Sequence, residues 1–226
     1  RDGNMLLEKL VESGVDCSLL EHSEGVSGHA IIQVDDRGQN CILLHGGTNR
    51  MMTEDYVEHA LDAFGGRGLV LLQNETNLVG SIIKRAKAKG LMTALNAAPM
   101  DEAVFSYPLD LLDWLIVNEV EGAAIARCTR EEEILPALER AYPHLNVLLT
   151  LGERGSVCVC GGEQTRFGAY RVKAADTTAA GDTFLGYFLN ETINGAEVSE
   201  ALALATAASA LCVQVMGAAD SIPPRE

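Results

Sequence analysis

The stretch "AADTTAAGDTFLGYFL", residues 174–189, decides the fold of this chain. It begins with small residues around an aspartate, Asp176, and reaches a second aspartate, Asp182, where an apolar run starts. Small side chains let the backbone turn sharply into a helix and leave the first N–H groups of that helix uncovered. The stretch therefore predicts a helix over residues 180–193 whose beginning is open to a ligand.

The open beginning of this helix predicts an anion site. Uncovered N–H groups and the positive end of the helix dipole both attract a phosphate group. Gly181 lets a ligand approach the backbone without meeting a Cβ atom. Asp182 would repel a phosphate, but its carboxylate could take the proton of a hydroxyl that attacks the bound phosphate. The alternative is that Asp182 only interacts favourably with the helix dipole.

Apolar strands and helices alternate along the rest of the chain. Strands are predicted at residues 68–73, 91–96, 111–118, 146–152, 155–160 and 164–172. Helices are predicted at residues 3–14, 54–64, 77–90, 119–127 and 196–213, and Thr129 with Glu132 has the spacing of a capping box that would begin another. This alternation predicts an α/β fold, a doubly wound and mostly parallel sheet with helices on both faces.

Residues 28–46, "GHAIIQVDDRGQNCILLHG", predict a hairpin of two strands around a turn at 35–38. The unpaired edge of such a hairpin is often covered by a partner, so we expect a homodimer.

Composition excludes some classes of function. The chain has 226 residues and a formal net charge of −15, which argues against binding nucleic acid because phosphate backbones attract basic surfaces. Neither a signal peptide nor a membrane span is recognisable. The six cysteines contain no C-x-x-C pair, so we expect buried or half-buried free thiols and a cytoplasmic protein, with zinc binding or disulfides as the alternatives.

Two further stretches fall where predicted strands end, which is where ligands bind in such sheets. "TLGERGS", residues 150–156, has glycines that suit the passage of phosphates close to the backbone, although a plain hairpin turn explains it equally well. "NEVE", residues 118–121, places an amide and a carboxylate on one face of a helix start, where they could hold water-coordinated Mg²⁺ near phosphates. The same pair can act as a capping box, and the two roles are compatible.

Together, and in this order, these stretches resemble the ribokinase-like (PfkB) family of sugar and nucleoside kinases. "DTTAAGDTF" is similar to the family's C-terminal signature, "NEVE" to its Mg²⁺-associated motif, "TLGERG" to its nucleotide loop and "GAADSIP" to the tail of ribokinases. The resemblance covers residues 1–226 as one ribokinase-like domain, with the hairpin at 28–46 as part of a small β lid. It also implies that the chain is incomplete at the N-terminus, because the family's first core strand and its Gly-Gly motif have no counterpart here.

The resemblance implies an ATP-dependent kinase that phosphorylates a primary hydroxyl of a small sugar. Asp182 would be the base on that hydroxyl, with an anion hole made by Ala179, Ala180 and Gly181. Glu75 would contact the sugar, although it could also be only an exposed acid in a loop. The resemblance further implies that the ATP contacts are Asn118, Thr150, Leu151, Gly152, Glu153, Arg154, Gly155 and Gly181, and that Thr206 lines the adenine pocket.

The family also implies two metal ions. Glu121 would be associated with Mg²⁺. A monovalent cation, normally K⁺, would be held by Asp176, Thr178, the carbonyl groups of Cys212, Val215 and Gly217, and the hydroxyl of Ser221. Asp176 would then fix the loop that carries Asp182, whereas the alternative is that Asp176 only caps its own turn.

Among the sugars, D-ribose is the best candidate, and other sugars or nucleosides remain open. The other hypothesis is a catalytically inactive fragment that binds a nucleotide or a sugar. An unrelated dinucleotide-binding domain would need G-x-G-x-x-G after its first strand, and the sequence contains neither that motif nor G-x-x-x-x-G-K-[ST].

Overall fold

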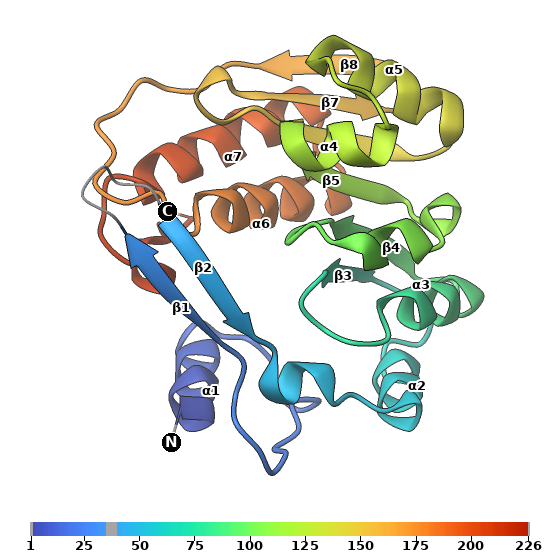
Figure 1. Cartoon of the computed structure of the whole chain (residues 1–226), viewed down its shortest axis with the longest axis vertical. Coiled ribbons are helices and arrows are strands. Elements are labelled where there is room, and N and C mark those ends of the chain that lie inside the picture. The colour runs from blue at the N-terminus through green and yellow to red at the C-terminus, as the bar shows by residue number, and fades with distance from the viewer. Residues whose placement is uncertain (1, 35–39, 226) are drawn as a thin grey trace.

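The computed structural model describes residues 2–34 and 40–225 and contains one large and one small sheet (Figure 1). The large sheet has the strand order β3-β4-β5-β6-β7-β8. Its strands are β3 (Leu69–Gln73), β4 (Met92–Asn96), β5 (Trp114–Asn118), β6 (Asn146–Thr150), β7 (Ser156–Cys160) and β8 (Glu163–Phe167). The pairs from β3 to β6 are parallel, and β7 and β8 continue the sheet in antiparallel fashion. The prediction of a mostly parallel sheet is confirmed.

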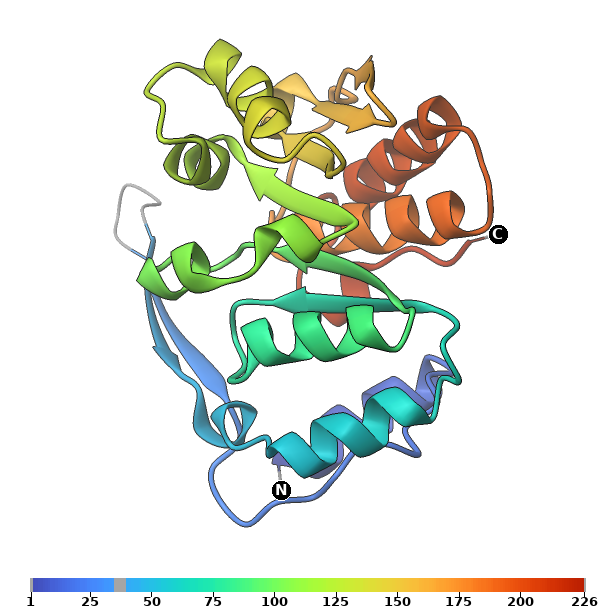
Figure 2. The same ribbon diagram turned by 90° about the vertical axis from the view of Figure 1, so that its right-hand side faces the viewer.

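Helices cover both faces of this sheet (Figure 2). One face carries α2 (Glu54–Asp62), α3 (Val79–Ala88), α4 (Glu119–Ala126) and α5 (Glu131–Ala141), and the other carries α6 (Ala180–Ile193) and α7 (Val198–Cys212). Successive side chains of a strand point to opposite faces, so β5 contributes Leu115 and Val117 to the first core and Trp114 and Ile116 to the second. The doubly wound architecture follows from these two apolar layers.

A small antiparallel sheet, β1 (His29–Val34) and β2 (Asn40–His45), stands apart from the large one (Figures 1 and 2). The turn predicted at 35–38 lies outside the described residues. The helix α1 (Asp2–Glu12) precedes this hairpin, and Lys9 forms an ion pair with Asp220 in the short C-terminal helix η5 (Ala219–Ser221). The first helix is thereby tied to the end of the chain.

Several predicted details are wrong. The helix α5 begins at Glu131 after an N-cap, Arg130, whose side chain makes no capping hydrogen bond, so Thr129 and Glu132 form no capping box. Three glutamates in the first turn of α5 interact favourably with the helix dipole instead. The last strand ends at Phe167 rather than at residue 172. The strand predicted at 111–118 begins only at Trp114, because Leu111 belongs to the short helix η3 (Leu109–Leu111), and the strand predicted at 146–152 ends at Thr150.

The described cysteines are free and differ in burial. Cys158 and Cys212 are buried, while Cys17, Cys128 and Cys160 are half-buried. Burial raises the pKa of the Cys158 thiol to about 12, so this side chain behaves as an apolar core residue. Over residues 2–34 and 40–225, no helix is long and apolar enough to cross a lipid bilayer.

Candidate active site

The start of α6 has free backbone donors. Its N-cap, Ala179, has a φ of 59° and no side chain that could cap the helix. A left-handed conformation costs a residue with a Cβ atom about 1 kcal/mol, and such strain is concentrated at functional sites. The N–H groups of Gly181 and Asp182 make no hydrogen bond to any described residue, although the neighbouring Ala180 N–H donates to the Thr177 carbonyl. The geometry therefore suits an anion.

Gly181 faces open space. A Cβ atom added to this residue would meet no atom within 4 Å, so packing inside the protein does not require a glycine. A glycine in a helix is nevertheless destabilising by about 0.5–1 kcal/mol relative to alanine. Room for a ligand is a physical reason for a glycine at this position.

Asp182 lies in the first turn of α6 and is exposed. Its Oδ1 atom accepts a hydrogen bond of 2.9 Å from Nε2 of Gln73, the last residue of β3. This bond brings the carboxyl end of β3 to the start of α6. Glu75, which is also exposed, follows two residues after Gln73, so the predicted base and the predicted sugar contact lie on neighbouring segments.

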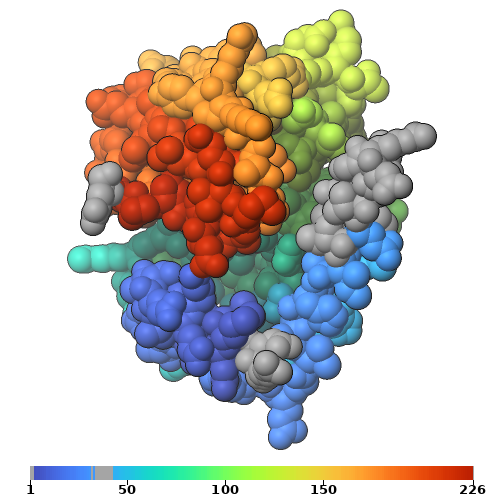
Figure 3. Space-filling view, turned by 90° about the vertical axis from the view of Figure 1, so that its left-hand side faces the viewer, coloured from blue at the N-terminus to red at the C-terminus, as the bar shows by residue number. Residues whose placement is uncertain are grey.

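The space-filling view from the side shows a hollow in the surface between the red C-terminal segment and the blue hairpin (Figure 3). Green residues from the middle of the chain lie at the bottom of this hollow.

The segment around Glu75 is held from two sides. Arg50, at the end of the short helix η1 (Gly47–Arg50), donates hydrogen bonds to the carbonyl groups of Asn74 at 3.1 Å and of Thr76 at 2.9 Å. Asn74 is fully buried and donates to the Pro99 carbonyl at 2.8 Å. The hairpin side of the molecule and the loop after β4 thus fix the backbone on both sides of Glu75.

The sequence motifs predict no role for Gln73, Arg50 or Asn74. Gln73 and Asn74 are polar residues at the end of an apolar strand, which is the signal that led to the other candidates. The sequence around Arg50 has no such pattern. Its hydrogen bonds to the carbonyl groups of Asn74 and Thr76 depend on how η1 is placed against the end of β3.

The predicted nucleotide loop joins β6 to β7 through the short helix η4 (Gly152–Arg154). The N–H group of buried Leu151 donates to the Gly155 carbonyl at 2.8 Å, and Gly155 has a φ of 92°. A Cβ atom on Gly155 would lie 2.0 Å from the carbonyl oxygen of Phe167, so only glycine fits. Because Asn118 pairs with Thr150 in the sheet, the two predicted nucleotide-binding segments are neighbours.

Two side chains of this loop, those of Arg154 and Thr150, are also anchored. Arg154 forms ion pairs with Glu131 at 2.6 Å and Glu119 at 3.5 Å. The Thr150 hydroxyl donates to the Val117 carbonyl at 3.4 Å, and Glu153 is exposed.

Thr206, the residue predicted to line the adenine pocket, is buried in α7. Its hydroxyl donates to the Leu202 carbonyl at 2.7 Å, so its methyl group is the part left for packing.

Asn118 and Glu121 form a capping box at the start of α4. The Asn118 side chain accepts from the N–H groups of Val120 and Glu121, and the Glu121 carboxylate accepts from the Asn118 N–H at 2.9 Å. Burial raises the pKa of Glu121, whose side chain is only 7% exposed. The capping bond uses one carboxylate oxygen, and the second oxygen suits a water-bridged Mg²⁺.

Asp176 joins the anion-hole loop to the C-terminal tail. Its carboxylate accepts from the Thr178 hydroxyl at 2.7 Å, from the Thr178 N–H at 2.9 Å and from the Gly217 N–H at 3.0 Å. These bonds, the Thr178 hydroxyl first, hold the pKa of Asp176 below its ordinary value. The turn cap considered for Asp176 is therefore present, and the predicted approach of the tail to the same loop is also seen.

The remaining predicted cation ligands lie in that tail. Ser221 is buried, and its hydroxyl donates to the Ala218 carbonyl at 2.7 Å and lies 3.1 Å from Sγ of Cys212. Cys212 also receives a hydrogen bond of 3.3 Å from the Thr183 hydroxyl, in the first turns of α6. The carbonyl oxygen of Cys212 accepts from the Val215 N–H at 3.0 Å.

The chemistry of this donor set fits a monovalent cation. It consists of backbone carbonyl groups, hydroxyl groups and one carboxylate, which are hard oxygen donors with a single negative charge. In the described part of the chain, no cluster of three or more His, Cys, Asp and Glu side chains could hold a metal ion. A cation here would therefore depend mainly on backbone oxygens.

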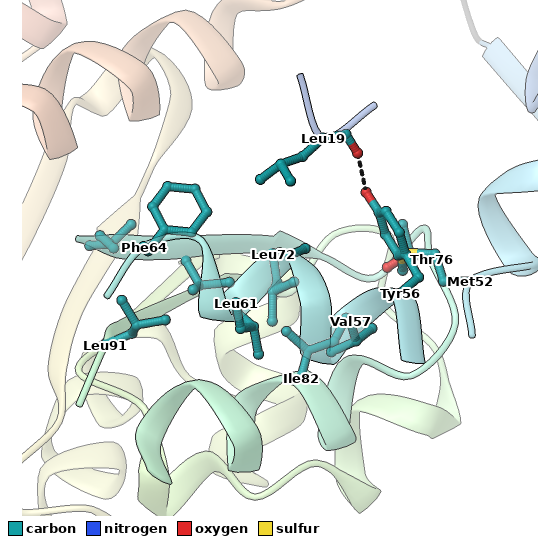
Figure 4. A pocket seen from close by; sticks show the side chains of 13 residues that line it. Leu19, Met52, Tyr56, Val57, Leu61, Phe64, Leu72, Thr76, Ile82 and Leu91 are labelled. Carbon is teal, nitrogen blue, oxygen red and sulfur yellow. Dashed lines mark hydrogen bonds between the residues drawn. The ribbon is translucent and has the colours of Figure 1, made fainter. Parts of the chain in front are cut away.

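A cavity of about 340 Å³ lies away from these residues, between α2, β3 and Leu19 (Figure 4). Its lining is apolar apart from Thr76 and Tyr56, and the Tyr56 hydroxyl donates to the Leu19 carbonyl at 2.9 Å. The predicted site residues do not line it. Its chemistry does not match a phosphate or a sugar.

Comparisons with known proteins identify the family to which the chain belongs. A family model described as "pfkB family carbohydrate kinase" matches residues 2–225. The chain is 34% identical to a ribokinase of Staphylococcus aureus (strain COL) over 97% of its own length and 75% of that protein. The structure of a ribokinase from Thermotoga maritima is similar with a TM-score of 0.81 and 31% identity, and covers 98% of this chain and 74% of that one. Arabidopsis thaliana ribokinase complexed with ribose and ATP gives 0.77 and 32%, over 90% and 68% of the two chains.

Proposed function

Because the chain belongs to the pfkB family of carbohydrate kinases, we propose that it transfers the γ-phosphoryl group of ATP to a primary hydroxyl of D-ribose. The family match confirms the resemblance noted in the sequence and the prediction of an ATP-dependent sugar kinase. The choice of ribose rests on relatives named ribokinase and on the relative whose structure holds ribose and ATP.

One observation carries the proposed chemistry. The Asp182 carboxylate stands beside the free N–H groups at the start of α6 and is hydrogen-bonded to the end of β3. In this arrangement the N–H groups stabilise charge on the transferred phosphoryl group, and Asp182 accepts the proton of the attacking hydroxyl. General-base catalysis of this kind contributes a factor of about 10²–10⁴ in rate.

The other roles follow the geometry of the site. Glu75 binds sugar hydroxyl groups from a backbone that Arg50 and Asn74 hold in place. The loop from Thr150 to Gly155 and Asn118 contact the nucleotide. Glu121 would hold Mg²⁺ through water, and the ion would supply charge neutralisation for the phosphates. Asp176 and the C-terminal tail would hold K⁺, and Asp176 would thereby fix the loop that carries the anion hole.

The proposal also covers the quaternary structure, the cellular compartment and the domain organisation of the protein. The hairpin of β1 and β2 acts as a lid over the sugar, and its exposed apolar residues, Ile31, Leu43 and Leu44, favour a homodimer. The free cysteines favour a reducing compartment, the cytoplasm. Residues 1–226 contribute to one domain.

Two substitutions in the complete protein test the assignment. Asp182→Asn keeps the size of the side chain but cannot accept the proton, so kcat should fall by about 10²-fold or more with little change in ATP affinity. Glu75→Ala should raise KM for the sugar and leave KM for ATP unchanged.

A steady-state assay with ribose, other pentoses, fructose and nucleosides as acceptors gives the measurement. A fall of less than about tenfold in Asp182→Asn would reject the base assignment. Preference for an acceptor other than ribose would reject the substrate, and a change confined to KM for ATP in Glu75→Ala would reject the sugar contact.

A further inference from the structure

Among the described residues, Gln73 is the one whose side chain donates a hydrogen bond to the Asp182 carboxylate. The bond joins Nε2 of Gln73 to Oδ1 of Asp182 at 2.9 Å, between residues that are 109 positions apart in the sequence. No ion pair to Asp182 exists among the described residues. From this geometry, and resting on the proposed function, we propose that Gln73 is a positioning residue that orients Asp182 toward the sugar hydroxyl.

The chemistry of an amide suits this task. An amide donates a hydrogen bond without carrying a charge, so it orients the carboxylate and does not pair with it as a lysine or arginine would. The bond uses Oδ1 and leaves Oδ2 free to accept the proton of the attacking hydroxyl. A base at the exposed start of a helix otherwise turns freely about its χ angles, and a fixed orientation lowers the barrier by bringing reacting atoms into line.

Gln73 itself is on a rigid support. It is the last residue of β3 and pairs with Asn96 in the parallel ladder to β4. The next residue, Asn74, is fully buried, and its N–H donates to the Ala98 carbonyl at 2.9 Å while its side chain donates to Pro99. These bonds hold the end of β3 in place, and the Gln73 side chain therefore presents its amide to Asp182 from a fixed backbone.

The arrangement also couples the two ends of the sugar site. Gln73 contacts the proposed base, and Glu75, two residues later, is the proposed sugar contact. A sugar bound at Glu75 and a base held by Gln73 are thus placed by the same short segment.

The test uses two substitutions of similar size in the complete protein. Gln73→Met removes the donor, and Gln73→Glu replaces it with a second carboxylate that repels the first. We expect kcat to fall about three- to tenfold in Gln73→Met and further in Gln73→Glu, with KM for ribose and ATP changed less than about twofold. The matched control is Gln164→Met on the exposed strand β8, which should leave kcat unchanged.

A double-mutant cycle separates positioning from a general structural effect. In the Asp182→Asn background, Gln73→Met should have no further effect on the residual rate, because there is no base left to orient. The inference is overturned if Gln73→Met has the kcat of the wild type, if the loss falls on KM, or if the loss is as large in the Asp182→Asn background. A loss of less than about tenfold in kcat for Asp182→Asn alone would instead reject Asp182 as the base in the proposed function.

Discussion

Single residues at the start of α6 show a conflict between stability and ligand binding. Ala179 adopts a left-handed conformation that disfavours a Cβ atom, and Gly181 occupies a helical position where alanine would be more stable. Packing does not require a glycine at position 181, because a Cβ atom there would face open space. Both features are explained if the backbone must present free N–H groups to a phosphate.

This conflict predicts that a methyl group added at position 181 has opposite effects on stability and on activity. Gly181→Ala should raise the free energy of unfolding by up to about 1 kcal/mol, because helix propensity improves and no clash arises. The same substitution should lower kcat/KM for ATP by at least about tenfold, because the methyl group occupies the space of the phosphate. Thermal unfolding and steady-state kinetics measure the two effects.

The matched control is Gly186→Ala in the same helix, which also faces open space. It should raise stability by a similar amount and leave the kinetics unchanged. If Gly181→Ala is as active as Gly186→Ala, the anion hole does not lie at Gly181.

At the scale of an element, the start of α4 combines a capping box with a proposed metal contact. Glu121→Gln separates the two roles, because the amide oxygen still accepts the Asn118 N–H but carries no charge. Burial raises the pKa of Glu121, so the ionised carboxylate costs stability, and the cost is present only where Glu121 is ionised.

Glu121→Gln should therefore be at least as stable as the wild type at pH 8, and the difference should shrink as the pH falls toward 4. Its requirement for Mg²⁺ should rise severalfold. Asn118→Ala is the comparison, since loss of the cap costs about 1 kcal/mol. Lower stability at pH 8 with an unchanged Mg²⁺ requirement would mean that Glu121 is only a capping residue.

The loop before α6 depends on a second element, the C-terminal tail. Asp176 is the shared acceptor of the loop and of the Gly217 N–H. If K⁺ binds there, replacing it with tetramethylammonium should depress kcat, and Asp176→Ala should remove that sensitivity. Asp220→Ala, a nearby exposed acid paired with Lys9, should retain it. Equal activity with and without K⁺ would reduce Asp176 to a turn cap.

At the scale of the whole molecule, the small sheet is separate from the large sheet and exposes apolar side chains. Ile31 and Leu43 are cross-strand partners on one face and are 54% and 55% exposed, which is unusual for large apolar side chains in a stable sheet. Such a face needs a covering surface, and a second copy of the chain would supply one.

The proposed homodimer can be tested directly by sedimentation experiments. The wild type should sediment as a dimer, and the double substitution Ile31→Ser with Leu43→Ser should shift it toward the monomer and raise KM for the sugar. The control Val120→Ser removes an apolar side chain that is 71% exposed outside the hairpin, and it should remain a dimer. A monomeric wild type would contradict the proposal.

Features that depend on interactions between residues close in the sequence were predicted better than features that depend on distant residues. The bounds of α6 were predicted without error, because Ala179 to Asp182 and the apolar residues after them specify a helix start locally. The prediction of a capping box at Thr129 was wrong, because such a motif shows only which local hydrogen bonds are possible. In the structure α5 begins at Glu131, two residues after Thr129, and Arg130 is its N-cap. The long last strand failed because pairing with β7 ends at Phe167.

The sequence by itself determined the alternation of strands and helices, and it was enough to propose the anion site and the base, since these depend on residue spacing, backbone donors and side-chain chemistry within a few positions. Only the tertiary structure decided that Gln73 touches Asp182, that Arg50 clamps the backbone around Glu75 and that the Gly217 N–H reaches Asp176. These contacts join residues between 24 and 109 positions apart. Their partners are set by which strands and helices pack together, and packing depends on the apolar surfaces of the whole sheet rather than on any local pattern.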